Sequence, residues 1–142
     1  MAVIYIIGSL RNPRIPEVAN LIRAEGHEAV DDWFSPGPDA DSRWQEYEQK
    51  RGRSYKEAIN GLHASHVFAF DKYHLDRADA ALLVQPAGRS AHMELGYMAR
   101  TKPAFVLFEG MPERFDVMYR FATDLFFSDE EFVNALQNGA IV

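Results

Sequence analysis

The sequence predicts an α/β fold in which a five-stranded parallel sheet lies between two layers of helices. Two observations support this fold class. Short, almost wholly apolar runs recur along the 142 residues, as expected for strands that are buried on both faces. Stretches with helical periodicity separate these runs, and such alternation is typical of βαβ units. Because no repeat, low-complexity tract or linker divides the chain, we expect a single domain over residues 1–142.

The chain opens with the clearest βα pair. Val3–Ile7 is continuously apolar and predicts a buried strand that ends at Gly8. The stretch that follows is amphipathic, with Val18 and Ile22 on one face, and Gly26 supplies a helix stop.

The next third of the chain is more polar. Residues 28–34 predict a second strand, which is weaker because two aspartates fall within it. Residues 35–42 predict a loop from their proline, glycine and aspartate content. Residues 43–78 have a polar helical pattern, and we expect two helical pieces with a break near Gly61 or Ala64.

The last part of the chain supplies three more strands. Residues 80–86 predict the central strand, and residues 103–110 and 124–128 predict the fourth and fifth strands. Helices are expected over 88–100 and 129–139. Five strands with helices between them indicate a flavodoxin-like three-layer sandwich, in which ligands bind at the carboxyl ends of the strands.

Composition excludes several classes of function. The chain has 15 basic and 21 acidic residues and a net charge of −6, so it is unsuited to binding a nucleic acid polymer. It has no cysteine, and its five histidines show no metal-ligand spacing, so no thiolate, disulfide or metal chemistry is expected. The first apolar run is too short for a signal peptide or a membrane span. We therefore expect a cytoplasmic protein with no membrane association.

Glu94 is the most conspicuous acid in the helix predicted over 88–100. If Ser90 is the N-cap, the acid of a capping box belongs at position 93, where the chain has Met93. Glu94 falls one position later. One interpretation is an acid in the first turn that the helix dipole stabilises. The other is a carboxylate at the ligand edge that acts as a nucleophile or stabilises a cation-like carbon.

Two aspartates precede the central strand. Asp71 and Asp79 are eight residues apart, about two helical turns, so they share one side of a helix provided that it is unbroken. The alternatives are a solvated helix acid for Asp71 and a turn or cap residue for Asp79. Asp76 is most simply a surface charge.

The strand exits carry the candidate binding residues. Gly8 allows close backbone approach, and Ser9 and Arg11 offer donors to a sugar hydroxyl or a phosphate. Arg89 and Ser90 offer a second set of donors. The aromatic residues near these exits, which either stack on a nucleobase or belong to the core, are Trp33, Phe34, Trp44 and Tyr47.

Three segments together resemble the nucleoside 2-deoxyribosyltransferase superfamily, which includes 2′-deoxynucleoside 5′-phosphate N-hydrolases and pyrimidine-nucleotide hydrolases. They are "IYIIGSLRNP", "FDKYHLDRADAALLVQP" and "GRSAHMELGYMARTKPAFVLF", and the third is the most specific. The resemblance covers most of the chain.

The resemblance implies roles for individual residues. Glu94 matches the nucleophile that attacks the anomeric carbon C1′, and Asp71 matches the aspartate near the sugar and the departing base. Ser9 and Arg11 match the turn around the 5′ end. Ser90, which follows Gly88 and Arg89 at the start of the third segment, lies near a phosphate-contacting serine of the hydrolase branch.

The resemblance also implies a homodimer or larger assembly with shared active sites. A neighbouring subunit is expected to complete each site from its C-terminal region, for which Asp116, Tyr119 and Arg120 are the candidates.

The activity implied is cleavage of the N-glycosidic bond of a (deoxy)nucleoside or nucleoside 5′-monophosphate, without a metal or cofactor. The sugar passes to water or to another base, and the catalytic residues do not separate these outcomes. The sequence also leaves open which base is bound, whether the sugar is deoxyribose or ribose, and whether a 5′-phosphate is required. The alternatives are a non-catalytic nucleotide-binding or sensor domain and a TIR-like NAD glycohydrolase, which also places a glutamate in a flavodoxin-like sheet.

Overall fold

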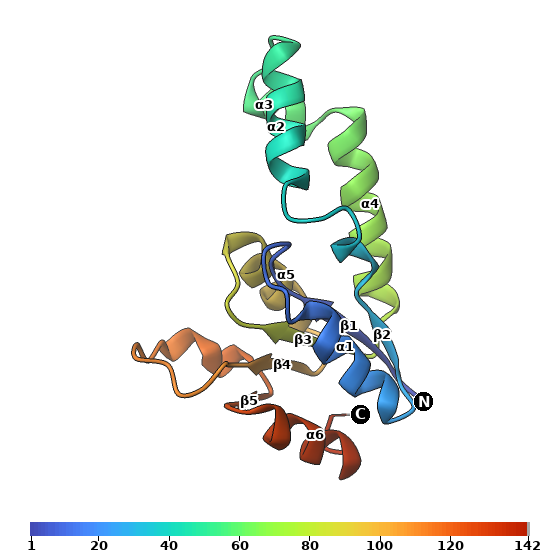
Figure 1. Cartoon of the computed structure of the whole chain (residues 1–142), viewed down its shortest axis with the longest axis vertical. Helices are drawn as coiled ribbons and strands as arrows, with labels where there is room; N and C mark the ends of the chain where they lie inside the picture. The colour runs from blue at the N-terminus through green and yellow to red at the C-terminus, as the bar shows by residue number, and fades with distance from the viewer. Residues whose placement is uncertain (142) are drawn as a thin grey trace.

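The computed structural model, which describes residues 1–141, has a single all-parallel sheet at its centre (Figure 1). The strand order is β2-β1-β3-β4-β5. The strands are β1 (Val3–Ile7), β2 (Glu28–Val30), β3 (Ala80–Val84), β4 (Ala104–Leu107) and β5 (Asp124–Phe126). This is the flavodoxin-like order, and the predicted fold class is confirmed.

Helices cover both faces of this sheet. The α-helices are α1 (Ile15–Ala24), α2 (Ala40–Lys50), α3 (Tyr55–Ile59), α4 (Leu62–Arg77), α5 (Arg89–Ala99) and α6 (Asp129–Gln137). Two 3₁₀ turns, η1 (Asp32–Phe34) and η2 (Val117–Phe121), complete the elements. One core cluster joins the sheet to α1 and α6, and the other joins it to α4 and α5. The sheet is therefore the middle of three layers.

The helix stops follow the expected chemistry. Gly26 after α1 and Gly139 after α6 have positive φ angles of 83° and 70°, which a glycine adopts without strain. Ser128 caps α6, since its side chain accepts a hydrogen bond from the Glu131 N–H at 3.1 Å.

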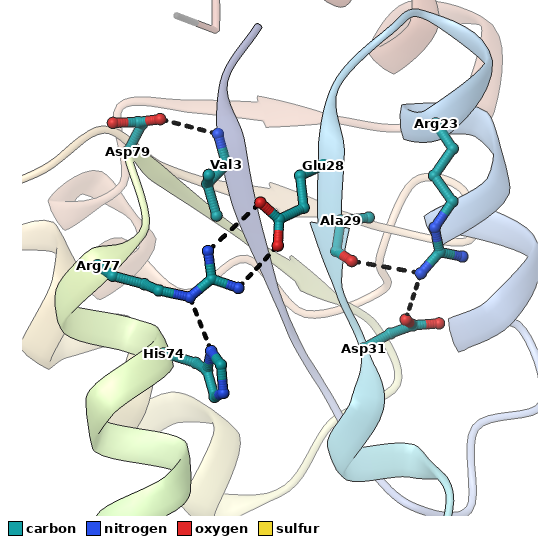
Figure 2. Close-up of polar contacts among 8 residues, drawn as sticks. All are labelled: Val3, Arg23, Glu28, Ala29, Asp31, His74, Arg77 and Asp79. Carbon is teal, nitrogen blue, oxygen red and sulfur yellow. Dashed lines mark hydrogen bonds and ion pairs between the residues drawn. The ribbon is translucent and has the colours of Figure 1, made fainter.

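The second strand is shorter than predicted, because the chain turns at its two aspartates. β2 ends at Val30, and the Asp31 carboxylate accepts a hydrogen bond from Arg23 of α1 at 2.6 Å (Figure 2). The next residues form η1, where the Trp33 indole N–H donates to the Ile6 carbonyl at 2.8 Å. These contacts direct the backbone out of the sheet.

The polar middle of the chain has one more helix than predicted, and the loop before it is shorter. α2 already begins at Ala40, within the predicted loop. The expected break at Gly61 is present, where α4 takes that residue as its N-cap. A second break lies at Gly52, whose φ of 73° ends α2, and a capping box of Ser54 and Glu57 then starts α3. Figure 1 shows α2, α3 and the first half of α4 projecting beyond the sheet.

The prediction that Asp71 and Asp79 share one side of a helix is wrong. α4 ends at Arg77, and Asp79 lies beyond it at the amino edge of the sheet. There its carboxylate accepts a hydrogen bond from the Val3 N–H at 2.8 Å (Figure 2). Asp79 therefore ties the start of β3 to the start of β1, as its turn or cap interpretation requires.

None of the helices within residues 1–141 combines the length and the apolar character that crossing a membrane requires.

Candidate functional site

The strand order identifies the point of the sheet at which a ligand site is expected. β1 and β3 are neighbours, with Ile4 to Ile7 in register with Ala80 to Leu83. The chain leaves β1 towards α1 on one face and leaves β3 towards α5 on the other. The connections diverge there, and in such sheets ligands bind outside the carboxyl ends of the two strands.

α5 carries Glu94 along this edge. Ala91, Leu95 and Met98 are buried against the sheet and fix the rotation of the helix. The helix begins at Arg89 with Gly88 as N-cap, so Ser90 is not the N-cap. Glu94 therefore lies in the second turn, and no acid occupies the first turn. This excludes both a capping role and the dipole interpretation for Glu94.

α4 brings a second carboxylate close to Glu94. Partial burial and the nearby charge of Asp71 raise the pKa of Glu94 from 4.5 to about 7. Burial, followed by the charge of Asp41, raises the pKa of Asp71 from 3.8 to about 6. No hydrogen bond or ion pair within residues 1–141 neutralises Asp71 or Glu94. Because burial and, to a smaller extent, like charge disfavour the ionised forms, the pair retains a proton near neutral pH.

Tyr5 of β1 faces the same pair and was not singled out from the sequence. Its side chain is 1% exposed, and burial together with the charges of Glu94 and Asp71 raises its pKa well above the usual range. The phenol therefore stays protonated and can act as a hydrogen-bond donor beside the carboxylates. Within an apolar strand, the spacing of Tyr5 is that of any core residue, so the sequence carried no signal for this contact.

α2 contributes Asp41 to the surroundings of Asp71. The ring of Trp44 stacks on His63 of α4 at 6.3 Å, which holds α2 against α4. Asp41 lies one turn nearer the sheet than Trp44, and it is exposed. The sequence did not single out Asp41, because residues 35–42 were expected to form a loop. A residue in a loop has no helical phase from which its direction could be predicted.

The exit of β1 is a tight turn held against β3. The Asn12 side chain is 3% exposed and donates to the Gln85 carbonyl at 3.3 Å. A Cβ at Gly8 would approach Ile15 Cδ1 to 2.6 Å, so any larger residue there would displace the end of the Ile15 side chain. Ser9 Oγ accepts from the Arg11 N–H at 3.1 Å, while the Arg11 side chain is exposed at this edge. Asn12 holds this turn against β3, a contact that the sequence patterns did not reveal.

The start of α5 contributes further polar groups. Arg89 and Ser90 are exposed in its first turn, and no side chain caps Gly88. The backbone N–H groups of such a turn favour an anion. Trp33 follows β2 and is partly buried against both core clusters. Its N–H is already bonded to the Ile6 carbonyl, so only its ring is available to a ligand.

Asp116 and Tyr119 lie on the other flank of α5. The Gln85 amide donates to the Tyr119 hydroxyl at 2.6 Å, and that hydroxyl contacts His92 Nε2 at 2.8 Å. His92 is two residues from Glu94, about 200° around the helix, so this network faces away from the carboxylate pair. Asp116 and Tyr119 line a hollow of about 600 Å³ there. Within one chain, the fold does not bring them together with Glu94.

Among residues 1–141, no group of three or more histidine, aspartate or glutamate side chains is arranged to hold a metal ion.

Comparisons with known proteins give a match only at the level of structure. No protein-family model matches this sequence, and no curated protein sequence matches it. Among solved structures, a 2-deoxyribosyltransferase from the psychrotolerant bacterium Bacillus psychrosaccharolyticus is similar, and it is described as a biocatalyst for the synthesis of antiviral and antitumoral nucleosides. The TM-score is 0.65, with 94% of this chain and 91% of that chain covered and 17% sequence identity. At this identity the similarity shows a shared fold.

Proposed function

We propose that this chain cleaves the N-glycosidic bond of a (deoxy)nucleoside or nucleoside 5′-monophosphate through a covalent glycosyl-Glu94 intermediate. The observation that carries the proposal is the pair of Glu94 and Asp71, two carboxylates with raised pKa values at the β1/β3 switch point. Perturbed carboxylates at the ligand edge of a sheet are typical of catalytic sites. The shared fold with a 2-deoxyribosyltransferase supports a nucleoside as the substrate.

In the first step, an ionised oxygen of Glu94 forms a bond to C1′ while the bond between C1′ and the base nitrogen breaks. The electron pair of that bond goes to the base, which takes up a proton from Asp71 or from water. Positive charge builds on C1′ and the ring oxygen, and a carboxylate in a partly buried position stabilises it more than one in bulk water. In the second step, water or another base forms a bond to C1′ while the bond between C1′ and Glu94 breaks, and the proton that the attacking group loses passes to Asp71 or to water.

The proposed chemistry requires one proton on the carboxylate pair, with Glu94 ionised as nucleophile and Asp71 protonated as acid. Because the pKa of Glu94, about 7, lies above that of Asp71, about 6, the proton is mostly on Glu94 in the free protein. The reactive form is therefore the minority arrangement of the same proton, and the small difference between the two pKa values keeps it populated. Tyr5 supports the arrangement as a protonated neighbour that can donate to the carboxylate.

The remaining candidates are assigned to substrate binding. Ser9 and Arg11, with Gly8 in the same turn, are proposed to hold the 5′ end of the sugar. Arg89 and Ser90, behind the uncapped Gly88, offer donors to a 5′-phosphate. Trp33 is proposed to border the base. Asp116 and Tyr119 are proposed to reach the site of a neighbouring subunit, in a homodimer or a higher assembly.

The decisive test is base release by the wild type and by Glu94→Gln. Purified protein is incubated with nucleosides, nucleoside 5′-monophosphates and NAD, with and without an acceptor base, and the products are separated by chromatography. Glu94→Gln is expected to lower base release roughly a thousandfold or more, and mass spectrometry of quenched wild type should show a sugar adduct on Glu94. Glu130→Gln, an exposed acid in the first turn of α6, is the matched control with unchanged activity.

Two outcomes would contradict the proposal. If base release by the Glu94→Gln variant stays within a few-fold of the wild type, the covalent mechanism is excluded. Release of nicotinamide from NAD, with no activity on the nucleosides or their monophosphates, would instead support an NAD glycohydrolase.

A further inference from the structure

One side of α4 runs from the core, past the carboxylate pair, and into the open space above the sheet. Leu75 is 5% exposed and packs in the core, and Asp71, one turn earlier, is partly buried beside Glu94. Phe68, another turn earlier, is 68% exposed. At 100° per residue, Phe68 points within about 20° of the direction of Leu75 and about 60° from that of Asp71.

The position of Phe68 explains its exposure. The same direction that buries Leu75 against β1 leaves Phe68 uncovered, because α4 extends beyond the sheet at this level (Figure 1). With a rise of 1.5 Å per residue, Phe68 lies about 4.5 Å beyond Asp71 along the helix axis. An apolar ring is thus held over the carboxyl edge, one turn past the catalytic pair.

We propose that Phe68 stacks on the nucleobase of the bound substrate and thereby contributes to base specificity. This inference rests on the proposed function, since it takes Asp71 as the group next to the departing base. A base attached to C1′ beside Asp71 extends away from the sheet, towards the next turn of α4. Stacking on an aromatic ring depends on the π face that every base has, and a purine offers a larger face than a pyrimidine.

The same helix provides a matched control. Phe70 is also exposed, at 42%, but it lies about 200° from Phe68 around α4 and packs edge-on against His74 at 4.6 Å. If the aromatic residues of α4 serve only as an apolar surface, for example between two copies of the chain, Phe68 and Phe70 should be equivalent. If Phe68 contacts the base, only Phe68 should affect the substrate.

The first measurement is steady-state base release by wild type, Phe68→Ala, Phe68→Tyr and Phe70→Ala, with one purine and one pyrimidine nucleoside. Phe68→Ala is expected to raise KM about 5- to 100-fold with little change in kcat. The increase should be larger for the purine. Phe68→Tyr should stay within about threefold of the wild type, since it keeps the ring, and Phe70→Ala should be unchanged. Circular dichroism and sedimentation check that fold and assembly state are kept.

The second measurement separates this inference from the proposed function. The same nucleosides are titrated by calorimetry into Glu94→Gln and into the double variants that add Phe68→Ala or Phe70→Ala. Weaker binding with Phe68→Ala alone supports the stacking role, even if the wild type releases no base and the proposed function fails. Base release by the wild type together with unchanged KM in Phe68→Ala overturns the stacking role and leaves the proposed function intact. Equal effects of both alanines, or no nucleoside binding at all, also overturn it.

Discussion

The two edges of the sheet hold carboxylates in opposite situations. At the amino edge, Glu28 of β2 accepts two hydrogen bonds from Arg77, at 2.7 and 3.3 Å, and Asp79 accepts one from the Val3 N–H (Figure 2). The hydrogen bonds from Arg77 lower the pKa of Glu28. At the carboxyl edge, Asp71 and Glu94 have neither a cation nor a hydrogen-bond partner within residues 1–141, and both pKa values are raised.

This difference indicates what each edge is for. A carboxylate with partners is most stable when ionised, and it holds neighbouring elements together. A carboxylate that is partly buried beside another acid is destabilised in its ionised form, and it keeps its lone pairs available to a ligand. Structures accept this instability mainly at functional sites. The difference supports the proposal that the carboxyl edge carries the chemistry, while the carboxylates of the amino edge hold neighbouring elements together.

The largest expected effect is on catalysis at the carboxyl edge. Asp71→Asn should lower kcat about 10²- to 10⁴-fold, because the departing base loses its proton donor. For the wild type, kcat/KM should be bell-shaped in pH: activity falls at low pH when Glu94 is protonated and at high pH when Asp71 is ionised. In the Asp71→Asn variant, kcat/KM should still rise with pH as Glu94 ionises, but it should no longer fall at high pH. Chromatographic rates between pH 4 and 9 provide the measurement.

Asp76→Asn is the control for this prediction. Asp76 is on the same helix, but it is exposed and pairs with Lys72 at 2.8 Å. Its removal should leave both rate and pH profile unchanged. An Asp71→Asn enzyme that keeps the bell shape and most of its rate would show that the acid is another group, for example water.

Much of the fold could be predicted from the sequence, because β1, β3 and β4 are contiguous apolar runs and α1 is amphipathic. The errors lie where long-range contacts decide the backbone. β2 stops at Val30 because Asp31 meets Arg23 of a different element, and no local pattern contains that contact. The early start of α2 has the same origin, since its packing on α4 through Trp44 and His63 is not a local property.

The candidate site was predictable to a smaller extent. Helical spacing placed Glu94 one position beyond a capping box but did not distinguish a dipole acid from a nucleophile, and the resemblance to a family favoured the nucleophile. The error for Asp79 came from extending α4 by two residues. Tyr5 looked like an ordinary core residue, because its role depends on which side of the sheet α4 and α5 cover.

The second effect is on stability, and its sign should differ between the edges. The pKa of Glu94 is raised from 4.5 to about 7, so its ionisation destabilises the fold as pH rises through this range. Glu94→Gln should therefore increase the free energy of unfolding at pH 8 by an amount on the order of 1–3 kcal/mol. The gain should disappear near pH 4, where Glu94 is protonated in both states. Urea unfolding at the two pH values measures it.

Glu28→Gln provides the opposite case. Its pKa is lowered by Arg77, so its stabilisation is present above pH 4.5 and is lost as pH falls. Replacing it should cause a small loss of stability at pH 8, because the pair is exposed. Equal signs for Glu94→Gln and Glu28→Gln at pH 8 would remove the distinction between the edges.

The smallest expected effect concerns Asp79. Asp79→Ala should lower the free energy of unfolding by about 1 kcal/mol, because the Val3 N–H loses its acceptor. Asp79→Asn should lower the free energy of unfolding by less, since its amide oxygen can still accept the hydrogen bond from the Val3 N–H. Amide hydrogen exchange at Val3 should be faster in the alanine variant, while base release per folded molecule stays at the wild-type level. If Asp79→Ala instead lowers base release as strongly as Asp71→Asn does, the amino edge takes part in the reaction, and the assignment of chemistry to the carboxyl edge alone is wrong.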